Sequence, residues 1–421
     1  MKKSQLLKKI SQTKKSSQSL TDVKASQRKK IILDIADRLE KNVSKIIKAN
    51  KQDIKEQEAL KKPFGFIERM ILDKAKILDL SRSLREIAQM KDVVFSVLDK
   101  KTRPSSIKIK KVRVPLGLIA IIYESRPNVT VESFILCFKS ANAVILKAGR
   151  EIAQTNKVFI SLIKKVLKDN QLDPKIVLDL SLIERDLVKE LLVNENIDCL
   201  IPRGGKGLID FVKQQAKVPV IETGASVVHT YIDQDANLNL AQKVVLNAKT
   251  RRVSICNALD VLLIDKAIYK KILKKITPSL KKKKVEIRAD RSSFDFLKKL
   301  DYPRLKKAKP GDFDSEFLDY ILTVKLVNDF SQALDHIQKH SLGHSEAVIT
   351  ESLAKARKFF KKIDAACLYW NTSTQFSDGA QFGLGGEIGI STQKLHARGP
   401  FSFESLTTYK YLIKSPGAVR K

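Results

Sequence analysis

The feature that most constrains the fold is a regular alternation of short apolar segments with amphipathic ones. The runs "LGLIAIIYES" and "NAVILKAG" have the length of buried strands, and "EIAQTNKVFISLIKKVLKDN" repeats apolar residues at helical spacing. The alternation continues through "IDCLIPRG" and "KGLIDFVKQQA", and it begins again after Cys256 with "ALDVLLID". Strands and helices that alternate in this way predict an α/β protein built from βαβ units, with parallel sheets covered by helices on both faces.

Three regions depart from this alternation. Residues 19–99 show helical periodicity, whereas "SIKIKKVRVPLG" and the tail "FESLTTYKYLIK" favour extended strands. Residues 277–315 are polar and poor in strand signals, which predicts a surface excursion. Because 421 residues exceed what one hydrophobic core usually serves, we expect more than one domain.

Charge and cysteine usage restrict the class of protein. A formal net charge of +34 is the electrostatic signature of nucleic-acid binding, but the lysines are dispersed and only residues 281–284 form a run. Aromatic residues make up 6% and do not alternate with basic ones, so nucleic-acid binding stays a secondary alternative. No apolar run approaches the roughly 18 residues of a membrane span. Four cysteines without metal spacing indicate reduced thiols in a cytoplasmic protein and no metal site.

Two segments are candidates for binding an anion. In "CLIPRGGKGLIDFV" a strand is followed by Arg203, Gly204, Gly205 and Gly207 and then by a helix, so backbone N–H groups and the helix dipole could face a phosphate. Lys147 ends the strand of "NAVILKAG" in a similar position. The spacing of the first segment matches neither a Rossmann fingerprint nor a Walker loop, and a tight turn explains it equally well. For Lys147 alone, the local pattern favours an ordinary surface lysine.

Other polar residues follow predicted strands or lie in a connecting loop. Arg126 and Asn128 come directly after "LGLIAIIY", at the carboxyl end of the strand, where open α/β sheets bind ligands. The Asn128 amide could donate to an oxyanion or cap the following helix. Glu222 ends "VPVIE", and Cys256 lies in "NAKTRRVSICNALD" beside two arginines, the electropositive setting that a reactive thiol requires.

Taken in order, these motifs resemble a known family. The set "PLGLIAIIYESRPNVTVES", "IPRGGKGLI", "VPVIETG", "NAKTRRVSICNALD", "GHSEAVITE" and "STQKLHARGP" is similar to the glutamate-5-semialdehyde dehydrogenases, also called gamma-glutamyl phosphate reductases, of the aldehyde dehydrogenase superfamily. The resemblance extends from about residue 19 to the end of the chain. It implies an aldehyde dehydrogenase-like fold with a Rossmann-type cofactor domain, an α/β catalytic domain and a small oligomerisation element.

The resemblance also implies a reaction. The family reduces L-glutamate 5-phosphate to the semialdehyde with NADPH in the second step of proline biosynthesis. Cys256 matches the nucleophile that forms a thioester, and Asn128 matches the oxyanion-stabilising asparagine. Lys147 and the loop from Arg203 to Gly207 match positions that hold the cofactor, and Glu316 matches a glutamate near the nicotinamide ribose.

The remaining residues and the alternative reaction follow from the same resemblance. Arg126 and Arg398 are candidates for holding the substrate's charged groups, because guanidinium binds carboxylate or phosphate bidentately, although either could anchor its own loop. Glu222 matches the base of hydrolytic aldehyde dehydrogenases, so a hydrolytic enzyme that oxidises a small aldehyde is the alternative activity. In a phosphate reductase Glu222 would be a pocket or structural residue.

The expected domains and partners complete the sequence-based hypothesis. Residues 1–125 and 146–235 are expected to bind NADPH, and residues 236–385 to form the catalytic domain. Residues 126–145 and 386–421 are expected as extended oligomerisation elements, since an exposed strand can pair with the edge of a sheet in another subunit. The expected partners are the small-molecule substrate, further copies of the chain and the glutamate 5-kinase that makes the labile substrate. Neither nucleic acid nor a membrane is expected as a partner.

Overall fold

The computed structural model describes residues 1–420. The side chains of Phe64, Arg185 and Lys206 lie outside the description, as does residue 421, the last of the predicted 386–421 element. The chain divides into two compact units. The first comprises residues 1–223, 383–389 and 401–421, and the second comprises residues 224–382 and 390–400.

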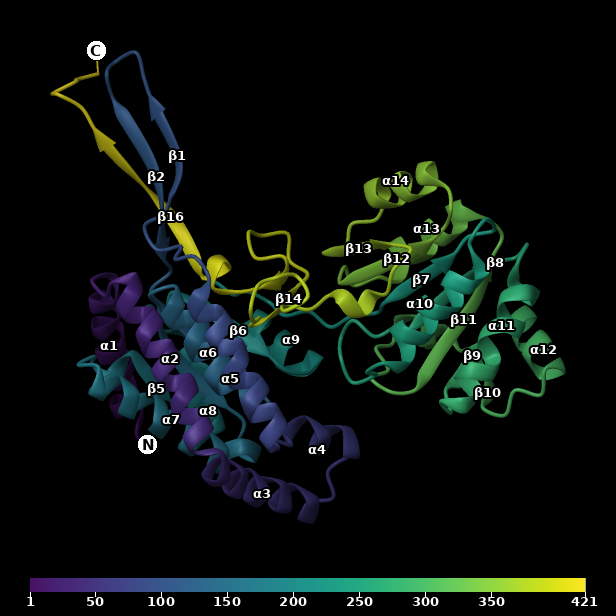
Figure 1. Cartoon of the computed structure of the whole chain (residues 1–421), viewed down its shortest axis with the longest axis horizontal. Coiled ribbons are helices and arrows are strands. Elements are labelled where there is room, and N and C mark those ends of the chain that lie inside the picture. Colours follow the sequence, from purple (N-terminus) through teal and green to yellow (C-terminus); the bar gives the residue numbers. More distant parts are fainter. Residues whose placement is uncertain (421) are drawn as a thin grey trace. The chain divides into compact units, whose positions relative to one another are not determined.

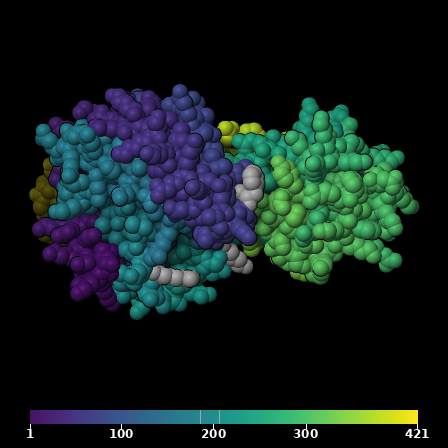
Figure 2. Space-filling model, turned by 90° about the horizontal axis from the view of Figure 1, so that it is seen from below, coloured from purple at the N-terminus to yellow at the C-terminus, as the bar shows by residue number. Residues whose placement is uncertain are grey.

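The first unit begins with helices, as the periodicity predicts. They are α1 (Lys3–Ser17), α2 (Ala25–Lys41), α3 (Val43–Ala59), α4 (Phe64–Met70) and α5 (Lys74–Gln89). In α2 the residues Ile31, Ile32, Ile35 and Leu39 recur at steps of one to four, and all are buried, so one face of the helix joins the core. The N-terminal helices form a large part of this unit's visible surface (Figure 2). The predicted helical region ends early, because a strand begins at Val97.

A four-stranded parallel sheet forms the centre of the first unit (Figure 1). Its strands are β3 (Leu118–Tyr123), β4 (Ala143–Ala148), β5 (Val177–Asp179) and β6 (Cys199–Arg203), and its helices are α6 (Asn128–Lys139), α7 (Ala153–Asp169), α8 (Arg185–Val193) and α9 (Lys206–Gln215). The strand order is β5-β4-β3-β6. The chain therefore runs outward from β3 to β5 and returns on the other side of β3, which creates a switch point between β3 and β6. In such sheets, ligands bind at the carboxyl ends of the strands beside the switch point.

The prediction of an extended element at residues 126–145 is wrong. Residues 128–139 form α6, in which all residues from Val129 to Lys139 except Glu132 are buried, and residues 143–145 begin β4 of the central sheet. The physical reason is the apolar run "SFILCF", which buries more surface as a helix packed inside the unit than it could in an exposed arm.

The predicted C-terminal strand is confirmed. β16 (Thr407–Lys414) pairs antiparallel with β2 (Lys108–Pro115) along its whole length, and β1 (Val97–Thr102) pairs with the other edge of β2. β16 is an edge strand of this sheet, and Tyr409, Tyr411 and Ile413 on it are exposed. A strand of this length with apolar side chains and an open edge is a template for pairing with another chain.

The second unit contains a seven-stranded sheet in which every neighbouring pair is parallel. The strand order is β10-β9-β11-β8-β7-β12-β13. The strands are β7 (His229–Ile232), β8 (Val261–Asp265), β9 (Glu286–Ala289), β10 (Leu305–Lys307), β11 (Ile321–Val327), β12 (Ser345–Ile349) and β13 (Cys367–Trp370). The helices are α10 (Leu238–Thr250), α11 (Tyr269–Lys282), α12 (Arg291–Lys299), α13 (Phe330–His340) and α14 (Leu353–Lys362). A further two-stranded sheet pairs β14 (Gly389–Ser391) with β15 (Gly399–Phe401).

The prediction of a surface excursion at residues 277–315 is wrong. This region contains the end of α11, the strands β9 and β10, and α12 between them, all belonging to the seven-stranded sheet and its cover. β9 and β10 have only four and three residues, and β9 carries Glu286 and Arg288, whose side chains form an ion pair at 2.9 Å. Short strands with paired charges lack the apolar run from which a strand is predicted.

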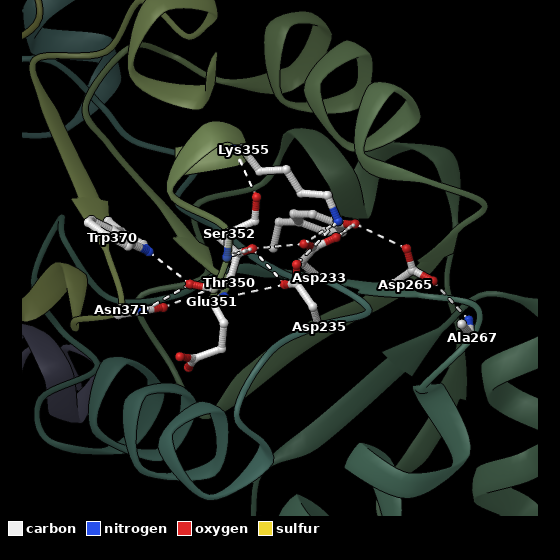
Figure 3. A network of polar contacts seen from close by, with 11 residues as sticks. Asp233, Asp235, Asp265, Ala267, Thr350, Glu351, Ser352, Lys355, Trp370 and Asn371 are labelled. Carbon is white, nitrogen blue, oxygen red and sulfur yellow. Dashed lines mark hydrogen bonds and ion pairs between the residues drawn. The ribbon is translucent and has the colours of Figure 1, made fainter. Parts of the chain in front are cut away.

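A polar network closes the carboxyl edge of the seven-stranded sheet (Figure 3). Asp233 is fully buried after β7, and it accepts hydrogen bonds from Lys355 Nζ at 2.6 Å, Thr350 Oγ1 at 2.8 Å and Tyr231 Oη at 3.0 Å. Tyr231 Oη also reaches Asp265 at the end of β8, at 3.2 Å. These contacts compensate the cost of burying the Asp233 carboxylate. They join β7, β8 and β12 at the carboxyl edge of the sheet, opposite to the edge at which the chain enters β8.

None of the helices in residues 1–420 combines the length and apolar character that crossing a bilayer requires.

Candidate active site

Cys256 lies in the loop of residues 251–260, between α10 and β8 of the second unit, at the amino ends of the parallel strands. It is partly exposed, whereas Cys137, Cys199 and Cys367 are buried. Burial raises the pKa of the Cys137 thiol and raises the pKa of the Cys199 thiol to about 12, so both stay protonated at neutral pH. Cys256 is therefore the thiol that is placed to react with a small molecule.

The segment of residues 374–377 holds this loop in place. Gln375 Nε2 donates to the carbonyl oxygens of Ala248 at 3.0 Å and Arg252 at 3.2 Å. Arg251 Nη1 donates to Gln375 Oε1 at 3.0 Å, so this guanidinium anchors the loop. The residue after the cysteine, Asn257, donates through Nδ2 to the Ser377 carbonyl oxygen at 2.9 Å. The loop thus has a fixed conformation around a partly exposed thiol.

Ser226 connects the cysteine to Glu316. Its hydroxyl is fully buried and donates to the backbone carbonyl oxygen of Cys256, and it lies 3.0 Å from Glu316 Oε1. The structure therefore brings together two of the predicted site residues, Cys256 and Glu316, through a serine that the sequence did not single out.

Two buried charged residues flank the loop. Lys249 lies in the last turn of α10 and is fully buried, and its Nζ donates to the Leu259 carbonyl oxygen at 2.8 Å. Asp260, 2% exposed, precedes β8. Burial lowers the pKa of Lys249 to about 8 and raises the pKa of Asp260 to about 6, while the attraction between the two charges opposes both shifts.

The first unit has a cavity of about 750 Å³ at the carboxyl ends of its strands. Its described lining comes from the carboxyl ends of β3 and β4 and the residues that follow them. The helices α3, α4, α8 and α9 and the segment between α3 and α4 complete it. These residues are Glu56, Gln57, Leu60, Lys62, Phe66, Ile122, Tyr123, Glu124, Lys147, Gly149, Arg150, Glu151, Val188, Gly207, Leu208 and Phe211. The cavity lies at the switch point between β3 and β6, where the topology places a ligand.

Lys147 and Gly207 are the predicted cofactor residues that line this cavity. Lys147 Nζ donates to the Ala148 carbonyl oxygen at 2.7 Å, and burial lowers the pKa of Lys147. Two of the lining carboxylates already accept backbone hydrogen bonds: Glu151 from the Ser125 N–H at 2.7 Å, and Glu124 from the Gly205 N–H at 3.1 Å.

The glycine loop begins α9, with Gly205 as the residue that precedes the helix. A Cβ atom on Gly204 would meet the ends of the Glu124 and Leu208 side chains, so a larger residue there would displace them. Arg203 donates from Nη1 to the Ile388 carbonyl oxygen. Among the described residues that line the cavity, Gly207 comes from this loop, and Arg203, Gly204 and Gly205 are not part of the lining.

Asn128 is the first residue of α6, and the residue that precedes this helix is Pro127. The alternative in which Asn128 caps the helix is therefore wrong. Asn128 Nδ2 donates to Glu132 Oε2 at 2.9 Å, and the side chain is partly exposed. Arg126 directly precedes this turn and is also partly exposed. Both residues follow β3, at the edge of the sheet that the sequence predicted.

Glu222 and Arg398 are each paired within their own unit. In the first unit, Glu222 Oε2 forms an ion pair with Lys213 Nζ at 2.9 Å. In the second unit, Arg398 Nη2 lies 2.6 Å from Asp364 Oδ1, and Lys394 pairs with the other oxygen of that carboxylate. The Arg398 pairing is the one expected of a residue that anchors its own loop.

The sequence reasoning missed Ser226, Lys249, Asp260 and Glu124. A signal was present for two of them, because Lys249 lies in the apolar stretch "VVLNAK" and Asp260 opens the apolar strand "DVLLID". A charge in such a position is costly to bury, which marks it as a paired group. Among residues 1–420, no group of three or more His, Cys, Asp or Glu side chains is arranged to hold a metal ion.

The comparisons with known proteins agree with this architecture. The model of the aldehyde dehydrogenase family matches residues 1–294 and 313–411. The gamma-glutamyl phosphate reductase of Legionella pneumophila (strain Corby) is 46% identical over 413 residues, covering 97% of each chain. The protein of that name from a Nitratiruptor species is 40% identical, covering 98% of this chain and 99% of its own length.

A solved structure extends the comparison to three dimensions. The crystal structure of gamma-glutamyl phosphate reductase from Thermotoga maritima is 38% identical and superposes with a TM-score of 0.93, covering 99% of this chain and 100% of that one. An acetylating aldehyde dehydrogenase from Geobacillus thermoglucosidasius shares the fold, with a TM-score of 0.72 at 16% identity. The chain therefore belongs to the aldehyde dehydrogenase family and, within it, to the gamma-glutamyl phosphate reductases.

Proposed function

We propose that the protein reduces L-glutamate 5-phosphate to L-glutamate 5-semialdehyde and phosphate with NADPH, through a thioester at Cys256. The observation that carries this proposal is the 40–46% identity, over nearly the whole chain, to proteins named gamma-glutamyl phosphate reductase. The partly exposed Cys256 in an anchored loop supports it from the structure. The product is a precursor of proline.

In this mechanism the Cys256 thiolate attacks the acyl carbon of the substrate. The carbon–oxygen bond to phosphate breaks, phosphate leaves with the bonding electrons, and a thioester remains on Sγ. Hydride addition to the thioester carbon then breaks the carbon–sulfur bond, which releases the semialdehyde and regenerates the thiolate. Covalent catalysis divides the reduction into two steps, because the thioester keeps the activated acyl group on the enzyme until hydride is added.

The residues of the first unit's cavity fit a dinucleotide. The cavity has a volume of about 750 Å³ and lies at the switch point of the sheet. The cations Lys62, Lys147 and Arg150 line it and can face phosphate groups. When bound, NADPH supplies the hydride. Lys147 and Arg150 would hold the phosphate that distinguishes NADPH from NADH, and Gly207 at the start of α9 would let a phosphate approach the backbone. The family's use of nicotinamide cofactors agrees with this assignment.

Asn128 and the Cys256 backbone N–H are proposed to stabilise the oxyanion that forms during attack, because a preorganised donor at the developing charge lowers the barrier. The partly exposed side chain of Asn128 supports this role. Arg126 is proposed to bind a charged group of the substrate. For Arg398, the ion pair with Asp364 supports an anchoring role instead.

The ion pair of Glu222 with Lys213 supports a structural role for this carboxylate. In hydrolytic aldehyde dehydrogenases, the glutamate that Glu222 matches activates the water that deacylates the thioester. A phosphorylating enzyme also gains from excluding that water, since hydrolysis of the thioester would waste the substrate. The structure therefore lends no support to the hydrolytic alternative, and the dispersed lysines lend none to nucleic-acid binding.

The reaction is tested in reverse. With L-glutamate 5-semialdehyde and NADP, formation of NADPH is expected to depend on added phosphate, because phosphate is the acceptor of the acyl group. Absorbance of NADPH measures the rate, and arsenate in place of phosphate serves as a control for acyl acceptance. Sustained turnover in a buffer that contains neither anion would identify a hydrolytic enzyme instead.

Replacement of Lys147 tests the cofactor assignment. Lys147→Ala is expected to weaken NADPH binding roughly tenfold to a hundredfold, since a hydrogen bond to a charged group contributes about 1.5–3 kcal/mol, and to leave NADH binding nearly unchanged. Fluorescence titration of both cofactors measures this difference, with a Lys157→Ala variant at an exposed position as the matched control. Equal losses for the two cofactors would assign Lys147 to the ribose shared by both.

A homo-oligomer is proposed from the edge strand β16, whose free edge and exposed Tyr411 and Ile413 suit pairing with a second copy. Sedimentation equilibrium is expected to give a mass at least twice the 47.5 kDa of one chain, and a monomer at micromolar concentration would contradict this. A cytoplasmic location and delivery of the labile substrate by the kinase are proposed on the basis of the reaction. Co-sedimentation with that kinase tests the delivery.

A further inference from the structure

Lys249 and Asp260 enclose the Cys256 loop and have no part in the proposed chemistry. Both side chains are buried, at 0% and 2% exposure, so neither can touch a substrate. Removing two charges from water costs several kcal/mol each, and the protein recovers this cost only when the charges are well hydrogen-bonded. The contacts of these two groups therefore indicate what the pair does.

Asp260 joins three separate segments of the second unit. Its carboxylate accepts the N–H of Val228 on Oδ2 at 3.2 Å and the N–H of Phe317 on Oδ1 at 3.2 Å. Its own N–H donates to the Val228 carbonyl oxygen at 3.0 Å, and its carbonyl oxygen accepts the Thr323 N–H at 2.9 Å. Lys249 reaches the same point from α10, through its hydrogen bond to the carbonyl oxygen of Leu259.

Two of these three segments also contain the residues that surround Cys256. Ser226, two residues before Val228, donates to the Cys256 carbonyl oxygen, and Glu316 directly precedes Phe317. Ser226 and Glu316 contact each other at 3.0 Å. Asp260 thus holds the two backbone segments from which Ser226 and Glu316 extend, and Lys249 holds the end of the loop in which Cys256 lies.

We propose that Lys249 and Asp260 are positioning residues that keep the Cys256 loop, Ser226 and Glu316 in one arrangement, an inference that rests on the proposed function of Cys256. An ionised Asp260 accepts two N–H groups at once. A protonated or amide side chain would present a donor to one of them and break that bond. The nearby ammonium of Lys249 favours the ionised form of Asp260.

Asp260→Asn tests the proposal with an isosteric change. We expect kcat to fall at least tenfold while the KM for NADPH stays within twofold, because the change is in the other unit from the cofactor cavity. Amide hydrogen exchange is expected to accelerate in residues 226–228, 251–259 and 315–317 and to stay unchanged in α11. Asp260→Glu, which keeps the charge, is expected to recover most of kcat. Asp265→Asn, at the opposite end of β8, is the matched control and should keep kcat within twofold.

A second variant covers the case in which Asp260→Asn does not fold. Lys249→Gln keeps a donor for the Leu259 carbonyl oxygen but removes the charge, and the same changes in kcat and hydrogen exchange are expected. Unchanged kcat and loop exchange in both variants would overturn the proposal, and so would failure of both to fold, which would assign the pair to stability alone. The exchange pattern needs no turnover, so it separates this inference from failure of the proposed reaction.

Discussion

A parallel sheet that helices cover on both faces leaves polar chemistry only at the ends of its strands, and both units of this protein obey that constraint. In the first unit the strand β3 is buried throughout, so Glu124, Lys147 and Gly207 gather at the carboxyl edge beside the switch point. In the second unit the carboxyl edge is closed by the network around Asp233, and the partly exposed thiol of Cys256 lies at the amino edge.

The thiol's surroundings follow from the cost of burying polar groups. A loop of ten residues would carry many unsatisfied backbone groups if it packed without partners. Gln375 and Thr374 donate to the carbonyl oxygens of Arg252 and Asn257. Ser226 and Lys249 donate to those of Cys256 and Leu259. The result is a partly exposed cysteine on a loop whose backbone is fixed before a substrate arrives, which is the condition for stabilising a developing oxyanion with a backbone N–H.

Much of this architecture could be predicted from the sequence, and the failures have physical causes. The alternation of apolar strands and amphipathic helices predicted both parallel sheets, and the β-branched and aromatic tail predicted β16. The strands β9 and β10 were not predicted because they are short. Charged residues such as Glu286 and Arg288 in β9 also interrupt the apolar run by which a strand is recognised. The apolar run "SFILCF" was a local sign that α6 is buried, and the expectation of an extended element at residues 126–145 did not take it into account.

The candidate site could be predicted less completely than the fold. A single sequence could nominate Cys256 and Lys147 from their motifs, but it could not reveal partners that are distant along the chain. The approach of Ser226 to Cys256, the pairing of Glu222 with Lys213 and that of Arg398 with Asp364 each depend on the folded geometry. Asp260 is the clearest case, since its role follows only from the three segments that it joins.

The central claim is that Cys256 carries the acyl group, and trapping that group tests it most directly. Incubated with L-glutamate 5-semialdehyde and NADP in the absence of phosphate, the protein is expected to form about one NADPH per active site and then stop, because the thioester has no acceptor. Peptide mass spectrometry is expected to place a glutamyl group on Cys256, and Cys256→Ser should show neither the burst nor the modification. An unmodified Cys256 after the burst, or a glutamyl group on another residue, would contradict the account.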